Sequence, residues 1–400
     1  SYSVTGVQTC ALPICLFIIL PRVPYPTEKG DKLRAFHQIR HLAKTHEIIL
    51  CALNEGDLHE DALPVLRKIV KAVHIIPISK TAIALNLIRS LFSGKPFQVG
   101  YYYHHKAADR IDALIREYKP DHIFCQLIRV AAYAIPHLIP KTLDYQDVFS
   151  KGIERRIAGS PFYLRPFLRI EYTRLLRYER EVFDHFDHKL IISAPDRELI
   201  PHPDRHKIVI VANGVDTGFF HPIEREKQYD LVFTGNMGYP PNIESAEYLV
   251  NRILPRVKER LPGIRLLIAG ANPHLRVQVL RSAQVTVSGW IPDIRESYAT
   301  ARIFIAPMQI GTGLQNKILE AMAMKIPCIT SPLAFAALNA QKDQDILVAE
   351  TPDEYADQIL MLLQDPDKAA SLAQNGYQFV RQNFSWEHET DKINQLLHQS

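Results

Sequence analysis

The chain has 400 residues, of which 47% are hydrophobic and 22% are charged. This balance is that of an ordinary globular protein and excludes an intrinsically disordered one. No apolar run approaches the ~20 residues that span a bilayer, so we expect a soluble, cytoplasmic protein. Because the length exceeds what one hydrophobic core usually organises, two domains are expected.

Residues 1–14 differ in character from the rest of the chain. They begin without methionine, and no charged segment precedes their short apolar patch, so they lack the pattern of a secretory signal. The stretch resembles the translated end of a sequencing adapter. We interpret it as foreign to the native protein, with a genuine disordered N-terminus as the alternative.

From residue 15 onward, short apolar strands alternate with helical segments. After a strand at 16–20 and a Pro/Gly loop, apolar residues recur at three-residue steps within 32–44, which predicts a helix with one buried face. Alternation of this kind predicts a parallel sheet covered on both faces. Further strands are predicted at 46–53, 72–78, 121–127, 141–145, 188–194 and 207–212.

The same alternation restarts after a linker over 213–228. Strands are predicted at 229–235, 264–270, 285–289, 302–307, 326–330 and 345–350, with helices from Asn242, Pro273, Asp293, Leu314 and Pro352. We therefore predict an α/β protein of two Rossmann-like, doubly wound parallel-sheet domains facing a central cleft. The domains are placed at 15–212 and 229–385, and a last helix over 386–400 can pack back on the first.

The clearest chemical signal lies in residues 302–324. An apolar strand ends near Pro307, a loop with Gly311 and Gly313 follows, and a helix opens near Leu314. Glycine lets the backbone approach a ligand closely. The start of a helix offers unpaired N–H groups and the positive end of the helix dipole, which bind phosphate readily.

Two charged residues on that helix fit a nucleotide ligand. Lys317, in the first turn, can neutralise diphosphate oxygens, and Glu320 can accept hydrogen bonds from ribose hydroxyls. Asn316 stands where a dinucleotide fingerprint would have its third glycine, so the loop alone is weak evidence. A plain strand-to-helix turn with a solvated lysine and glutamate is the alternative.

Other polar residues give weaker signals. Asp144 and Asp147 follow a strand of the first half, where open sheets bind ligands, and Asp147 either faces the predicted cleft or caps the next segment. Histidine and cysteine spacings match no zinc motif. The aspartate pairs 343/345 and 365/367 fit turns and helix caps, so no metal site is predicted.

Four motifs resemble family 4 retaining glycosyltransferases: NGVD followed by Phe and Pro within 213–222, LLIAGANP at 266–273, VTVSGWIPDIRESY at 285–298 and NKILEAMAMKIPCITS at 316–331. The resemblance runs from Leu16 to about Trp386. PRVPYPTEKGDKLRAFHQIRHLAK and LDYQDVFS are similar, more narrowly, to sugar transferases associated with exosortase/PEP-CTERM exopolysaccharide systems.

The resemblance implies a GT-B fold and an NDP-sugar donor, which is a substrate, so that no cofactor and no metal are expected. It also implies transfer with retention, by front-face attack in which the departing phosphate helps to take the proton. Glu320 matches the glutamate that holds the ribose. Thr312 stands where the family has a glutamate that contacts sugar hydroxyls. The family's Arg/Lys pair near Gly238 has no charged counterpart, which leaves Lys317 as the diphosphate cation.

Site residues follow from the motifs and the resemblance together. Lys317, Glu320 and Asp147 are expected to be catalytic, and Gly30 and Asp31 to form an acceptor-side loop. The expected partners are a nucleotide-sugar donor and a glycan or lipid-linked acceptor in exopolysaccharide synthesis, with no nucleic acid. The residues expected to bind the donor are Gly235, Gly238, Asn242, Gly289, Trp290, Ile291, Gly311, Thr312, Gly313, Leu314, Gln315 and Asn316.

Charge is concentrated in one segment. Eight positive and four negative side chains between Lys151 and Glu181 carry the whole formal charge of +4. Basic residues such as Arg169, Arg174 and Arg177, interleaved with aromatic and aliphatic ones, suit peripheral contact with an anionic inner membrane. A helix with one core face and one solvated, salt-bridged face is the alternative.

Two other functions stay open at this stage. A nucleotide-sugar 2-epimerase would share the architecture but needs acid/base groups that the sequence does not identify. A catalytically degenerate binding subunit would fit Thr312 in place of the family's glutamate.

Overall fold

The computed structural model describes residues 13–27, 29–310 and 314–399. The chain divides into two compact units. The first comprises Ser1–Val211 with Thr390–Ser400, and the second comprises Ala212–Glu389. In the part of the chain that the structure describes, no helix is both long and apolar enough to cross a membrane.

A sheet of seven parallel strands forms the centre of the first unit, in the order β3-β2-β1-β4-β5-β6-β7. β1 pairs with both β2 and β4, so the strand order reverses between β1 and β4. Open α/β sheets bind ligands beyond the carboxyl ends of the strands at such a reversal. The strands are β1 Cys15–Leu20, β2 Glu47–Asn54, β3 Ala72–Pro77, β4 His122–Gln126, β5 Lys141–Asp144, β6 His188–Ile191 and β7 Val209–Ile210.

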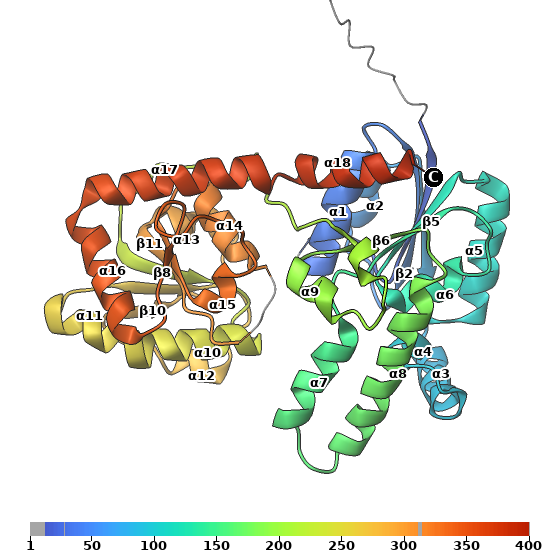
Figure 1. The fold of residues 1–400 in the computed structure, drawn as a ribbon, viewed down its shortest axis with the longest axis horizontal. Helices are drawn as coiled ribbons and strands as arrows, with labels where there is room; N and C mark the ends of the chain where they lie inside the picture. The colour runs from blue at the N-terminus through green and yellow to red at the C-terminus, as the bar shows by residue number, and fades with distance from the viewer. Residues whose placement is uncertain (1–12, 28, 311–313, 400) are drawn as a thin grey trace, which may run out of the picture. The chain divides into compact units, whose positions relative to one another are not determined.

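Nine α-helices of the first unit are described, and α7 and α8 form a hairpin that extends away from the sheet (Figure 1). The helices are α1 Gly30–Leu42, α2 Ala62–Arg67, α3 Lys80–Ser93, α4 Phe97–Tyr102, α5 His105–Tyr118, α6 Ile128–Ala134, α7 Phe149–Gly159, α8 Arg165–Phe183 and α9 Ala194–Leu199, and a short 3₁₀ turn, η1, spans Arg205–Lys207.

Two buried glutamates of α8 hold neighbouring helices. The carboxylate of Glu179 accepts hydrogen bonds from the backbone N–H of Ser150 (3.0 Å) and from its hydroxyl (2.5 Å) at the start of α7. Glu171 accepts from the N–H groups of Phe97 (2.7 Å) and Gln98 (3.1 Å) at the start of α4. Burial raises the pKa of Glu179 to about 7. The carboxylates satisfy helix-start donors that would otherwise be unpaired.

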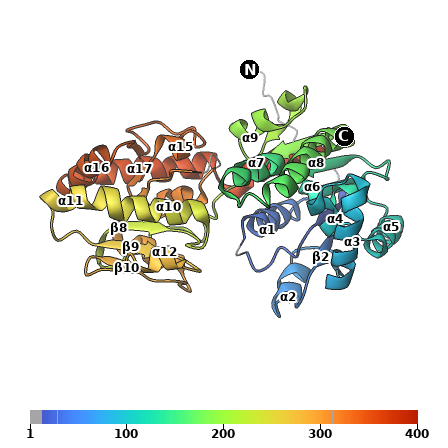
Figure 2. The same ribbon diagram turned by 90° about the horizontal axis from the view of Figure 1, so that it is seen from below.

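The second unit repeats the plan with six parallel strands in the order β10-β9-β8-β11-β12-β13. Helix α16 packs against both α11 and α17 (Figure 2). The strands are β8 Tyr229–Thr234, β9 Leu266–Ala269, β10 Val285–Val287, β11 Ala301–Ala306, β12 Cys328–Thr330 and β13 Leu347–Val348. The helices are α10 Pro240–Tyr248, η2 Leu249–Ile253 (a π-helical turn), α11 Leu254–Arg260, α12 Leu275–Gln278, α13 Ile294–Ala299, α14 Asn316–Ala323, α15 Pro332–Phe335, α16 Pro352–Gln364 and α17 Pro366–Asn383.

The last helix, α18 Trp386–Leu397, begins in the second unit and ends in the first. Its residues Ile393 and Leu397 are buried in the first unit's core together with Leu16 and Ile18. Within the second unit, the N–H of Ala212 donates to the Glu389 carboxylate at 2.7 Å, so the two points where the chain passes between units lie next to each other.

The predicted fold class is confirmed, and every predicted strand has a counterpart in one of the two parallel sheets. Some helix starts differ by two residues. α10 begins at Pro240 and not at Asn242, because proline fits the first turn, where its missing N–H needs no partner. α14 begins at Asn316, two residues after the predicted start.

Candidate active site

Lys317 is the second residue of α14, which follows β11 at the carboxyl edge of the second sheet. Only 9% of the residue is exposed. Its Nζ donates a hydrogen bond to Oδ1 of Asn242, lies 3.6 Å from the Met308 sulfur, and sits 5.0 Å from the centre of the Phe233 ring. The amine is therefore surrounded by one amide oxygen, a thioether and an aromatic face.

This environment leaves the positive charge of Lys317 poorly compensated. Within the described residues, its hydrogen-bond partners are neutral groups. Burial lowers the pKa of Lys317 to about 7, although the nearby Glu320 carboxylate acts in the opposite direction. An anionic ligand beside the amine would restore its usual protonation, so the site favours binding of an anion.

Glu320 belongs to a buried chain of hydroxyl groups. The Tyr298 hydroxyl lies 2.7 Å from Oε2 of Glu320 and 2.8 Å from Oγ1 of Thr234. Because an ionised carboxylate can only accept, Tyr298 donates to Glu320 and Thr234 donates to Tyr298. Burial raises the pKa of Glu320 and of Tyr298. The glutamate is thus held in one orientation by a tyrosine from α13.

Two glycine turns at the ends of β8 and β9 fix the position of Asn242. Gly235 and Gly270 have φ angles of +147° and +141°. A Cβ on Gly270 would lie 1.7 Å from the Gly235 carbonyl oxygen, and one on Gly235 would lie 2.7 Å from Nδ2 of Asn242. That Nδ2 donates to the Asn236 carbonyl at 2.9 Å, which directs Oδ1 to Lys317. Side chains at either glycine would displace the lysine's partner.

Gly311, Thr312 and Gly313 of the predicted phosphate loop lie outside the described residues. Leu314, which follows, packs against the core of the second unit. Gln315 is the N-cap residue of α14 and makes no side-chain cap hydrogen bond. The role predicted for these residues stays a prediction.

Asn316 opens α14. Its buried Oδ1 has no hydrogen-bond partner within the parts of the chain that the structure covers. An unsatisfied buried acceptor beside Lys317 is the kind of group that a bound ligand or water satisfies.

The remaining predicted donor residues lie in loops at the same edge of the sheet. Gly238 lies in the loop between β8 and α10, and its N–H donates to Oδ1 of Asn236 at 3.0 Å. Gly289, with φ +78°, follows β10 and precedes Trp290, which is 69% exposed. Ile291 is half-buried against the core. Since parallel strands end at one edge, these loops and α14 are brought to the same side of the second unit.

In the first unit, the two aspartates after β5 have different environments. Asp144 is fully buried and accepts hydrogen bonds from Arg34 (2.7 and 3.2 Å) and Gln38 (3.3 Å). Asp147 is exposed, and its carboxylate accepts from the N–H of Val148 at 2.7 Å. Asp144 is therefore a structural residue, and Asp147 makes a local turn contact that leaves its predicted catalytic role untested.

The predicted acceptor-side loop opens α1. Gly30 is its exposed first residue, and Asp31 forms an ion pair with Arg22 at 3.1 Å. Arg22 also donates to the Tyr102 hydroxyl at 3.0 Å.

A second arginine lies at the same reversal of strand order and was missed by the sequence analysis. Arg129, shortly after β4, donates to Oε1 of Gln98 (3.2 and 2.7 Å) and stacks 4.4 Å from the centre of the Phe149 ring. Burial, together with the charge of Arg22, lowers the pKa of Arg129. Arg22 and Arg129 follow β1 and β4 by two or three residues, and that position relative to the strand ends is the signal that could have found them.

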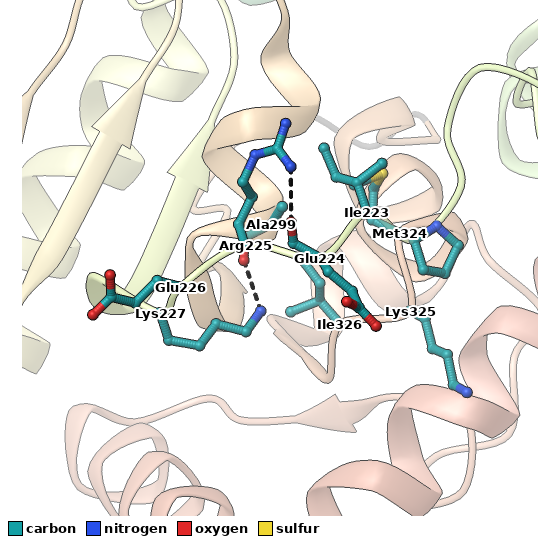
Figure 3. Close-up of a pocket in the computed structure, with 10 residues that line it drawn as sticks. Ile223, Glu224, Arg225, Glu226, Lys227, Ala299, Met324, Lys325 and Ile326 are labelled. Carbon is teal, nitrogen blue, oxygen red and sulfur yellow. Dashed lines mark hydrogen bonds between the residues drawn. The ribbon is translucent and has the colours of Figure 1, made fainter.

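A cavity of about 630 Å³ lies at the opposite edge of the second sheet (Figure 3). Its walls are residues 222–227, Ala299 and 324–326, which precede β8, β11 and β12. The Lys227 amine there donates to the carbonyls of Ala299 and Ala301, both at 2.8 Å. Because that amine is already engaged by two carbonyls, the candidate site remains the cluster around Lys317 at the carboxyl edge.

In each of the two aspartate pairs, one carboxylate has the predicted turn or cap role. Asp365 accepts from the N–H of Lys368 at the start of α17 (2.9 Å), and Asp345 accepts from that of Gln341 (2.8 Å). Among the described residues there is no group of three or more His, Cys, Asp or Glu side chains placed to hold a metal ion.

Comparison with known proteins identifies relatives of the chain. Residues 228–365, most of the second unit, match the family model for group 1 glycosyl transferases. A protein of 44.6 kDa from the cps region of Klebsiella pneumoniae, itself uncharacterised, is 22% identical over 92% of this chain and 96% of its own length. A Mycobacterium tuberculosis GDP-mannose-dependent phosphatidylinositol monomannoside mannosyltransferase is 27% identical, over 46% of this chain and 54% of its own length.

Solved structures show the same fold across almost the whole chain. Sucrose-phosphate synthase from Thermosynechococcus elongatus superposes with a TM-score of 0.69 at 16% identity, over 96% of this chain and 98% of that one. Anabaena HepE, solved in complex with UDP, gives 0.68 at 13% identity, over 97% and 100%. The chain thus has the GT-B fold, and its residues 228–365 match the family model for group 1 glycosyl transferases.

Proposed function

We propose that this protein transfers a sugar from an NDP-sugar to a glycan or lipid-linked acceptor. The observation that carries the proposal is the buried amine of Lys317, which is held at the start of α14 by an amide and has a pKa lowered to about 7. Among the described residues, the hydrogen-bond partners of this amine are neutral groups, and a buried cation of that kind suits a ligand that brings its own negative charge. UDP, the ligand in the HepE structure, is such a ligand.

The donor occupies the carboxyl edge of the second sheet. Lys317 and the first N–H groups of α14 hold the diphosphate, and as the glycosidic bond to phosphate breaks they stabilise the charge that develops on it. Glu320, oriented by Tyr298, accepts from the ribose hydroxyls. Trp290, whose ring is exposed in the loop after β10, is proposed to stack on the base.

The acceptor binds at the carboxyl edge of the first sheet. Arg22 and Arg129 flank the reversal of strand order there and can hold an anionic group of the acceptor, such as a phosphate. Asp147 lies in the turn that follows β5, at the same edge, and is the proposed catalytic carboxylate of this unit.

The finer assignment follows the sequence motifs. We propose a family 4 enzyme that acts with retention and without a metal, in exopolysaccharide synthesis like the PEP-CTERM-associated transferases. The relative in the Klebsiella cps region supports a polysaccharide context, and the mycobacterial relative, whose name describes a lipid-linked acceptor, supports the acceptor class.

A panel of NDP-sugars tests the proposal. A bound donor stabilises the fold by mass action, so the matching NDP-sugar should raise the melting temperature above that of NMP controls. The same donor should be hydrolysed slowly when no acceptor is present. Donor binding without hydrolysis or transfer would favour the degenerate binding subunit. Conversion of the donor to an epimer would favour the 2-epimerase.

A further inference from the structure

Exposed apolar side chains gather on one part of the first unit. α3 exposes Leu85, Ile88, Leu91 and Phe92, and the tip of the α7–α8 hairpin exposes Phe162, Tyr163, Leu164, Phe167 and Ile170. These are nine of the sixteen large apolar side chains that are exposed among the described residues. Phe92 and Phe162 are 86% and 81% exposed. We call these nine residues and the basic side chains between them the α3–α8 surface. Apolar patches of this kind mark interaction sites.

The two parts of the α3–α8 surface are tied together. The Arg174 guanidinium on α8 donates to the backbone carbonyls of Ser90 (2.6 Å) and Leu91 (3.0 Å) at the end of α3. The rings of Phe97 and Phe167 stack with their centres 4.6 Å apart. Figure 1 shows α3 and α4 beside the middle of α8. The patch is therefore one continuous feature of the fold.

The apolar side chains of this surface lie among basic ones. Residues 80–95 contain three basic side chains and no acidic one, and residues 155–170 contain four arginines and no acidic residue. Exposed members of the two groups include Arg89, Arg156 and Arg169. Cations interleaved with exposed aromatic and aliphatic groups match the interface of an anionic bilayer, where apolar groups enter the acyl boundary and cations meet the headgroups.

We propose that the α3–α8 surface docks on the face of an anionic lipid bilayer, with Phe92 and Phe162 inserted and the arginines on headgroup phosphates. Arg174 takes no part, because its guanidinium is engaged by carbonyls inside the protein. This corrects the sequence interpretation, which counted Arg174 among the membrane-facing cations. The alternative of a purely solvated polar face does not account for Phe167 and Ile170 on the exposed side of α8.

Vesicle co-sedimentation tests this proposal with the full chain. Wild-type protein should bind vesicles of equimolar phosphatidylglycerol and phosphatidylcholine, should bind phosphatidylcholine alone at least about tenfold more weakly, and should be released by high salt. The double variant Phe92→Ser/Phe162→Ser should bind the anionic vesicles about tenfold or more weakly, because two inserted rings are lost. Arg89→Glu/Arg169→Glu should lose a comparable factor.

Matched controls come from elsewhere on the first unit. Leu138→Ser removes a fully exposed apolar side chain outside the surface, and Arg116→Glu reverses an exposed charge on α5. Both controls should bind vesicles like the wild type. Equal binding to neutral and anionic vesicles, surface variants that bind as the wild type does, or a wild-type chain that ignores vesicles would each overturn the proposal. The last outcome would point to a protein partner. Transfer to a soluble acceptor is unaffected by these variants, so the proposed function is tested separately.

Discussion

The two units each bury a cation near the carboxyl edge of a parallel sheet, but they treat it in opposite ways. Arg34 in the first unit is fully buried and makes two hydrogen bonds to Asp144, which is equally buried. Lys317 in the second unit has an amide oxygen as its partner, and its pKa is lowered to about 7. A buried cation that pairs with a carboxylate of the same protein stabilises the fold. A buried cation whose hydrogen-bond partner is neutral can instead bind an anionic ligand.

The largest effect is expected from breaking the first pair. Arg34→Met leaves the buried Asp144 carboxylate without its charged partner, although the longer hydrogen bond from Gln38 remains. This should lower the free energy of unfolding of the first unit by about 3–5 kcal/mol. Both tryptophans of the chain, Trp290 and Trp386, lie in the second unit. Denaturation of the variant should therefore show an early circular-dichroism transition without a change in tryptophan fluorescence.

The control for this variant is Arg40→Met, at an exposed position of the same helix. It should change stability by less than about 0.5 kcal/mol. If Arg34→Met unfolded in one step together with the second unit, or at the wild-type denaturant concentration, the structural role of the pair would be wrong.

Lys317 should show the reverse pattern, with a large effect on activity and a small one on stability. Lys317→Ala should reduce turnover by about 100-fold or more, because one preorganised donor to the developing charge is removed. Steady-state kinetics with the donor found by the panel measures this, with exposed Lys368→Ala as the control. Unchanged turnover in folded Lys317→Ala would remove the lysine from the site.

The lowered pKa makes donor binding dependent on pH. In the free protein the Lys317 amine loses its proton above about pH 7, and a bound diphosphate raises its pKa again. Binding of NDP therefore takes up a proton, and its affinity should fall by up to about tenfold per pH unit above pH ~7. Calorimetry in buffers of different ionisation enthalpy measures the proton uptake.

Lys317→Met, which cannot titrate, is the control for the pH series. Its affinity for NDP should be weaker than that of the wild type and should not change with pH through the titration of residue 317. The linkage has the opposite sign in folding: because the pKa is lowered from 10.5 in the folded chain, the contribution of Lys317 to stability improves as the pH rises from about 7 toward 10.5. A pH series that is identical in the wild type and in Lys317→Met would contradict the assignment.

The smallest effect is expected at the ribose. Glu320→Gln keeps the shape of the side chain but weakens the charge-assisted hydrogen bonds, so free NDP should bind roughly tenfold more weakly. Tyr298→Phe, which removes the donor that orients Glu320, should act in the same direction. Normal NDP binding combined with complete loss of turnover would instead place Glu320 at the sugar.

The sequence predicted the fold well because the information is local. Uninterrupted apolar strands such as residues 16–20 are buried on both faces, so they can be recognised in the sequence without knowing which strands they pair with. The roles of Lys317 and Glu320 were suggested by their spacing in one short segment. What the spacing cannot show is their partners: Asn242 is 75 residues from Lys317, and Tyr298 is 22 residues from Glu320.

Charge patterns were less reliable than apolar ones. Asp144 and Asp147 are both aspartates of one short segment. The first is buried and paired with Arg34, which is 110 residues away in the sequence, and the second is exposed. Arg174 was grouped with Arg169 and Arg177, but contacts with α3 withdraw it from the surface. The role of a charged side chain depends on the groups that surround it, and tertiary packing determines those groups.

The path of α18 has a consequence for how the protein can be divided. The backbone passes from the first unit to the second at Val211 and returns at Thr390, so the first unit is not encoded by one continuous stretch of the gene. A fragment that ends at residue 211 lacks Ile393 and Leu397 and would expose the apolar groups they cover, including Leu16. Exchange of halves between relatives should therefore carry the last eleven residues with the N-terminal half, and chimaeras cut only once should aggregate.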